Sequence, residues 1–228
     1  MTEYFSEDTG REKYSCSIKF VCIASKSQFV GMSIGLNSGE KRGLSQENSM
    51  RLYHYYEREK GPFRSISDLS DEDGEKVLEQ IRKDKPDIFL AKRPSDYLQK
   101  RRRFETILRN EFIKIGGRPE RDTPHYLVVE EVPFFEKWYE HTASIIIDTD
   151  ELDTSMLSFT YGDSHPTFSG NVKDGKEYRN RLYSFEEIQN IIDKYGLPQE
   201  WNPDFKYGPE CYVEVQVWTD RGLEKWLE

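Results

Sequence analysis

The chain has 228 residues, of which 36% are hydrophobic and 14% aromatic, and its 42 acidic and 33 basic side chains give a net charge of −9. This aromatic content excludes global disorder, and the length suits one large domain with a single core. The acidic balance is unlike that of a dedicated nucleic-acid binder, and no run of about 20 apolar residues predicts a membrane helix.

The first 49 residues differ in composition from the rest of the chain. Residues 1–15 are polar and charged, and residues 31–48 are rich in glycine and serine, so we predict a poorly ordered N-terminal arm over residues 1–49. Within it, residues 18–23 could form a short strand with Phe20 and Cys22 on one face.

The cysteines and the start of the chain bear on its location. Cys16, Cys22 and Cys211 form neither a CxxC pair nor an even disulfide framework, so we expect reduced thiols and no structural zinc. The acidic start of the chain is unlike the basic n-region of a signal peptide. These features predict a cytoplasmic protein without membrane partners.

The main domain is predicted to span residues 50–228. Its first half should hold one strand and two helices, because an aromatic, strand-prone run precedes two stretches with helical apolar spacing. The expected bounds are 51–56 for the strand, 70–85 for the first helix, which Ser70 caps, and 95–115 for the second, which Gly116 ends.

The second half of the domain changes to strand periodicity. Strand-prone runs are expected at 125–132, 144–147, 155–161 and 211–217, and Ser184 with Glu187 predicts a capped helix over 184–195. In the last strand, Val213, Val215 and Val217 alternate with polar or aromatic residues and should face the core. Helices that lead and strands that follow predict an α+β fold with a small mixed or antiparallel split sheet and flanking helices.

Basic side chains concentrate in residues 75–121, where fourteen Lys and Arg stand against eight Asp and Glu. The helix around residues 92–118 holds the run Lys100, Arg101, Arg102 and Arg103, which could contact phosphates of NAD or of a nucleic acid. Four consecutive residues span all faces of a helix, so at least one must turn towards the protein. One hypothesis is therefore a non-catalytic protein that binds nucleic acid or an acidic partner through this helix; the simpler interpretation is a solvated face.

Familiar catalytic signatures such as GxGxxG, the P-loop, GxSxG and HExxH are absent from the sequence. The segment Gly162-Asp163-Ser164-His165 could belong to a metal-assisted phosphohydrolase together with His125. A turn at the end of a strand is the favoured interpretation, because Gly, Asp and Ser are typical turn residues.

A more coherent pattern spans three predicted strands. Leu52-Tyr53-His54-Tyr55 comes first, Ser158-Phe159-Thr160-Tyr161 second and Tyr212-Val213-Glu214-Val215 last. These segments loosely resemble the ADP-ribosyltransferase superfamily, which uses a His-Tyr-Glu or Arg-Ser-Glu set in this order on a split sheet. The strand around Glu214 is similar to the one that holds the catalytic glutamate in toxin-like members. Tyr212 stands where the arginine-modifying type has Gln or Glu.

The resemblance implies an NAD-dependent enzyme that transfers ADP-ribose to a protein or nucleic-acid acceptor and needs no metal. Glu214 would stabilise the positive charge that develops on the ribose, His54 would bind the adenosine ribose, and Tyr161 would stack on the nicotinamide. The expected cofactor-binding residues are His54, Tyr55, Ser158 and Thr160. These roles require His54, Tyr161 and Glu214 to converge in one cleft. The alternative is that Glu214 is the solvent-facing partner of the buried valines, His54 is a core or edge residue, and Tyr161 is a packing aromatic.

Overall fold

The computed structural model describes residues 49–88 and 90–227. Its centre is an open five-stranded sheet with the strand order β3-β1-β2-β5-β4, in which all neighbouring strands are antiparallel. The strands are β1 (Arg51–Glu57), β2 (His125–Val129), β3 (Thr142–Asp148), β4 (Leu157–Tyr161) and β5 (Val213–Val217). The predicted α+β class is thus confirmed, with an antiparallel sheet. Residues 1–48 of the predicted arm, with its short strand over residues 18–23, lie outside the described residues.

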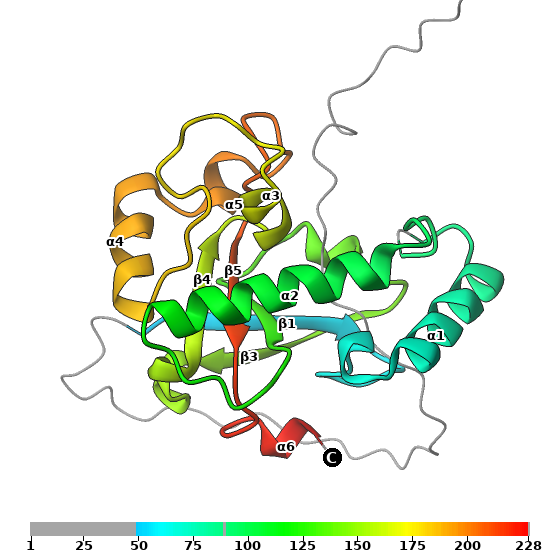
Figure 1. The fold of residues 1–228 in the computed structure, drawn as a ribbon. Helices are drawn as coiled ribbons and strands as arrows, with labels where there is room; N and C mark the ends of the chain where they lie inside the picture. Colours follow the sequence, from blue (N-terminus) through cyan, green and yellow to red (C-terminus); the bar gives the residue numbers. More distant parts are fainter. Residues whose placement is uncertain (1–48, 89, 228) are drawn as a thin grey trace, which may run out of the picture.

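Helices cover both faces of this sheet, with α2 crossing one face and α4 lying against the other (Figure 1). The helices are α1 (Asp71–Asp84), α2 (Tyr97–Lys114), α3 (Ser164–Phe168), α4 (Phe185–Tyr195), α5 (Pro198–Trp201) and α6 (Glu224–Leu227). Short 3-10 turns are η1 (Ile66–Asp68), η2 (Phe135–Lys137), η3 (Thr149–Glu151) and η4 (Thr154–Met156). None of the described helices is long and apolar enough to cross a membrane.

Local sequence signals explain where the longer helices begin and end. The Ser70 hydroxyl accepts the Asp73 N–H at 3.1 Å and caps α1. Ser184 and Glu187 form the predicted capping box of α4, with bonds of 3.3 Å and 2.9 Å. At the other end of α2, Gly116 adopts a left-handed φ of 98°, which permits the turn that stops the helix.

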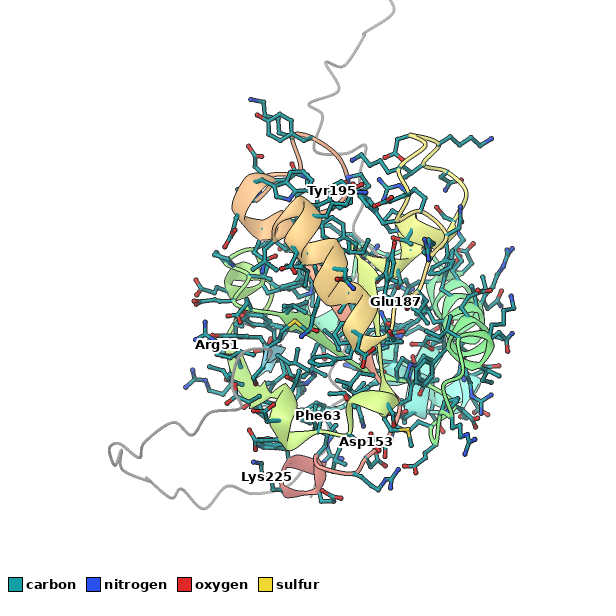
Figure 2. The ribbon with its side chains drawn as sticks, turned by 90° about the vertical axis from the view of Figure 1, so that its left-hand side faces the viewer. Arg51, Phe63, Asp153, Glu187, Tyr195 and Lys225 are labelled. Atoms are coloured by element: carbon teal, nitrogen blue, oxygen red, sulfur yellow. The ribbon has the colours of Figure 1, made fainter. Side chains whose placement is uncertain are left out.

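The alternating side chains of the strands divide the interior into two cores. One lies between the sheet and α2 and includes Tyr126 and Trp218; the other lies on the α4 side and includes all three valines of β5. Figure 2 shows α4 on this second side, between the labelled Glu187 and Tyr195. The predicted core face of β5 is confirmed, because Val213, Val215 and Val217 are fully buried.

The other face of β5 is buried as well. Glu214 is 1% exposed and its neighbour Gln216 is fully buried, both on the side that α2 covers. The interpretation of Glu214 as a solvent-facing strand residue is therefore wrong. Burial of two polar side chains in a central strand is costly unless they are hydrogen-bonded, so their partners define the region of interest.

Candidate functional site

His54 lies on the α4 side of the sheet, away from Glu214. Its ring stacks on the Phe63 ring with 4.1 Å between the ring centroids, and its Nε2 accepts the Phe63 N–H at 2.9 Å. Its Nδ1 therefore bears the proton and donates to the Tyr126 carbonyl at 2.9 Å. Burial lowers the pKa of His54 to about 3, so the ring stays neutral. Both ring nitrogens thus bond to backbone groups inside the core, and the ribose-binding role expected of His54 stays a prediction.

Tyr161 projects from β4 to the same α4 side. Its hydroxyl donates to the Gly196 carbonyl at 2.6 Å and accepts the Trp201 Nε1–H at 3.3 Å. Its ring packs against Tyr178, with 4.8 Å between ring centroids. The side chains of His54 and Tyr161 thus lie across the sheet from the Glu214 carboxylate, and the expected convergence of the three residues in one cleft is wrong.

The remaining cofactor-binding candidates lie on the α2 side. Tyr55 is a core residue whose hydroxyl accepts the Val132 N–H at 3.0 Å. Ser158 donates to the Gln216 Oε1 at 2.8 Å, and the Gln216 amide donates to Glu214 at 2.9 Å and to Thr160 at 3.5 Å. The structure therefore brings Glu214, Ser158 and Thr160 together through a residue that the sequence analysis had not singled out, Gln216.

Arg101 also reaches this side of the sheet, from α2. Its side chain is 1% exposed, and its Nε lies 3.1 Å from the Glu105 carboxylate and 2.6 Å from the Ser67 hydroxyl. Ser67 in turn donates to Glu105 at 2.8 Å. A guanidinium enclosed in this way cannot contact the phosphate of a nucleic acid, so the expected role of Arg101 in such a contact is wrong.

The other members of the basic run lie on different faces of α2. Lys100 pairs with Asp96 at 2.8 Å and Arg102 with Asp71 at 2.9 Å. Arg103 is exposed, and it forms no ion pair within the described parts of the chain. The four residues do not make one phosphate clamp, as the geometry of a helix predicted.

The Tyr126 phenol connects Arg101 with Glu214. The phenol is buried, its hydroxyl lies 3.5 Å from Glu105, and the Arg101 guanidinium lies 5.7 Å from its ring centroid. Burial raises the pKa of Tyr126 well above its usual value, and the nearby carboxylates of Glu105, Glu214 and Asp163 raise it further, whereas Arg101 lowers it. We call these five residues the Tyr126 site.

Asp163 enters the Tyr126 site from the turn after β4. It is fully buried, accepts the His165 N–H at 2.7 Å as the N-cap of α3, and lies 3.2 Å from the Tyr212 hydroxyl, which donates to it. The predicted strand-ending turn is therefore confirmed. His125 points to the opposite face, with its ring against Phe63, so the metal-assisted phosphohydrolase built from Asp163, His165 and His125 is not formed.

Acidic side chains outnumber basic side chains in the Tyr126 site. Three buried carboxyl groups lie near enough to raise the pKa of the phenol, and one of them, Glu105, lies 3.5 Å from its hydroxyl; the site has one buried guanidinium. The Glu105 Oε2 and, on α3, the Thr167 hydroxyl have no hydrogen-bond partner in the described part of the chain. Such an excess of buried acidic groups over basic groups is costly for a fold and is more common at sites that act on ligands.

A second group of possible ligand atoms lies at the far end of β1. Glu57, Glu59 and His141 place one ligand atom each within 4.8 Å of one another. The Glu57 carboxylate already accepts the N–H groups of Glu140 and His141, and His141 Nδ1 lies 2.6 Å from Glu59. These bonds within the protein account for the cluster.

Sequence reasoning had missed Tyr126, Glu105 and Gln216. One local signal was available: Glu214 and Gln216 are polar residues inside a run of valines whose strand is buried on both faces. The i,i+4 spacing of Arg101 and Glu105 also allowed an ion pair on one face of α2. Neither signal identifies the partner across the sheet.

Comparison with known proteins gives no match at any level. No family model matches the sequence, no curated protein is similar to it, and no solved structure matches the fold. The resemblance to ADP-ribosyltransferases stays a prediction that rests on short motifs.

Proposed function

We propose that the chain is an enzyme that cleaves the nicotinamide–ribose bond of NAD at the Tyr126 site and transfers ADP-ribose to a macromolecular acceptor. The observation that supports this best is the set of three buried carboxyl groups near one protonated phenol, with only one guanidinium among the five residues of the site. The proposal keeps Glu214 as the catalytic carboxylate and replaces His54 and Tyr161 by residues on the α2 side.

The charge of the Tyr126 site suits this reaction. When the bond between the ribose C1′ and the nicotinamide nitrogen breaks, its electron pair leaves with the nitrogen, and the ribose becomes an oxocarbenium-like cation. A carboxylate about 4 Å from such a cation stabilises it by roughly 4 kcal/mol at an effective dielectric constant of 20. Fixed charges of this kind need no reorganisation during the reaction, which makes them effective catalysts.

Each residue of the Tyr126 site then has a distinct task. Glu214, held by the Gln216 amide at 2.9 Å, faces the developing cation. Tyr126 remains protonated because of its raised pKa and donates a hydrogen bond to a ribose hydroxyl. Arg101 is a positioning residue that holds Glu105 in place.

We propose that substrate reaches the Tyr126 site at the contact between α2 and α3. The residues of the site are buried, whereas Phe104 of α2 and His165 of α3 are only partly buried and pack edge to face at 4.4 Å. The His165 N–H also donates to Asp163 at 2.7 Å, so this contact lies next to a residue of the site, and we propose that the two rings separate when substrate enters.

The test measures nicotinamide release from NAD, alone and with protein, DNA or RNA acceptors, for the wild type and Glu214→Gln. This substitution keeps size and most hydrogen bonding but removes the charge, so release should fall about 100- to 1000-fold while the melting temperature changes little. The matched control is Glu79→Gln, on the exposed face of α1. Tyr161→Phe, on the opposite face of the sheet, should keep its activity.

Two results would contradict the proposal. If the wild type neither binds nor consumes NAD with any acceptor, the proposed enzymatic function is refuted. If Glu214→Gln and Glu79→Gln turn over NAD equally fast, the Tyr126 site is not the site of the reaction. If only Tyr161→Phe loses activity, the reaction takes place on the α4 side of the sheet.

A further inference from the structure

The outer edge of the sheet at β3 is open in the described part of the chain. β3 pairs with β1 on one side, and no described strand pairs with the other (Figure 1). At its centre, Ile146 is 50% exposed and Ile145 is partly buried. Proteins usually shield such an edge, because unpaired backbone groups beside apolar side chains attract other strands.

The register shows which backbone groups of β3 face outwards. At the two ends of the β1–β3 ladder, Arg58 N–H donates to the His141 carbonyl at 2.9 Å and Thr149 N–H donates to the Met50 carbonyl at 3.0 Å. Antiparallel pairs alternate between bonded and non-bonded residues, so the odd-numbered residues of β3 bond to β1. The N–H groups of Ser144 and Ile146 therefore point away from the sheet.

The preceding part of the chain enters beside this edge. Met50 N–H donates to the Thr149 hydroxyl at 3.0 Å, which places the start of the described chain at the end of β3. Within residues 1–48, residues 18–23 are the strand-prone run. The intervening chain spans roughly 25 residues at up to ~3.5 Å each, whereas a strand as long as β3 measures only about 23 Å, so the run can reach the whole edge.

Charge also favours this segment over a second copy of β3. Residues 140–151, which contain β3, have four acidic residues and no Lys or Arg. Residues 11–26, which contain the run, have four Lys and Arg and one acidic residue. Two copies of β3 would bring acidic ends together, whereas the N-terminal segment brings opposite charges together.

We propose that residues 18–23 add to the outer edge of β3 as a sixth strand and cover Ile146. The main-chain bonds to Ser144 and Ile146 provide the attachment, and the apolar run covers the exposed isoleucine. This inference is independent of the proposed enzymatic function.

The test is residue-resolved amide hydrogen exchange in the full chain, in a variant lacking residues 1–25 and in a control lacking residues 1–15. The Ser144 and Ile146 amides should exchange at least about tenfold faster after the longer deletion, equivalent to a loss of ~1.4 kcal/mol of local protection. The Ala143 and Ile145 amides, which bond to β1, should stay protected. The shorter deletion should change neither these rates nor the melting transition.

A second variant tests the proposal even if the longer deletion unfolds the domain. Val21→Pro keeps the full length but removes one N–H and fixes one φ in the middle of the run, so it should reproduce the faster exchange of Ser144 and Ile146. Unchanged exchange in both variants would overturn the proposal. Protection that depends on protein concentration would assign the edge to a second copy instead and would also overturn it.

Discussion

Replacement of Arg101 by methionine is the sharpest test of the buried charges under α2. The change removes a guanidinium whose side chain is 1% exposed and leaves the Glu105 carboxylate, also 1% exposed, without its counter-ion. Removing one partner of a buried ion pair costs about 3–5 kcal/mol, because the other charge remains desolvated. That is a large share of the ~5–15 kcal/mol that stabilises a typical domain.

The effect should be clear in thermal and urea unfolding followed by tryptophan fluorescence and circular dichroism. For a domain of this size, 1 kcal/mol shifts the melting temperature by about 2–4 °C, so Arg101→Met should melt roughly 6–20 °C lower. The matched control is Arg103→Met on the exposed face of the same helix, which should stay within about 0.5 kcal/mol of the wild type.

A double variant tests the physical reason. Arg101→Met with Glu105→Leu removes both charges, and an apolar pair of similar volume should restore most of the lost stability. If Arg101→Met and Arg103→Met are equally stable, Arg101 is solvated and the buried pair does not exist. If the double variant is no better than Arg101→Met alone, the loss comes from packing and not from the unpaired carboxylate.

Two further predictions follow from buried titratable groups. The pKa of His54 is about 3 in the folded chain and 6.5 when unfolded, so the unfolded state binds the extra proton and stability falls as pH drops from about 6.5 towards 3. Between pH 7 and pH 5 His54 contributes a loss of roughly 2 kcal/mol, so urea unfolding should show a larger loss in the wild type than in His54→Gln, which keeps only the smaller effect of the other groups such as His125; equal slopes would contradict the buried neutral ring. The Cys211 thiol is buried and its pKa is raised well above the usual value, mainly by burial, so iodoacetamide should label it only after unfolding; rapid labelling of the native protein would contradict this environment.

Structural features that depend on residues close together in the sequence could be predicted from the sequence. The caps at Ser70 and Ser184, the stop at Gly116 and the alternation in β5 were all predicted, and the structure confirms them. Each depends on hydrogen bonds or periodicity within a few residues. The predicted ends of strands were less accurate where the backbone turns away from the strand. β2 was predicted to reach residue 132 but ends at Val129, because Glu130 adopts a left-handed φ of 58°.

The candidate site could be predicted only in fragments. Glu214, Ser158, Thr160 and Arg101 were singled out for two separate hypotheses, and the structure gathers them with Tyr126 and Gln216 on one side of the sheet. Tyr126 belongs to β2 and was not expected to take part, because its contacts join α2 with β5 across long stretches of chain.

The sequence by itself determined the fold class, most of the helix ends and the core face of β5. Only the tertiary structure decided which strands pair, and therefore that His54 and Tyr161 face α4 while Glu214 faces α2. It also decided that Arg101 is a buried partner of Glu105. The physical reason is that alternation fixes two faces for each strand, whereas the register and the helix packed above select which face meets which partner.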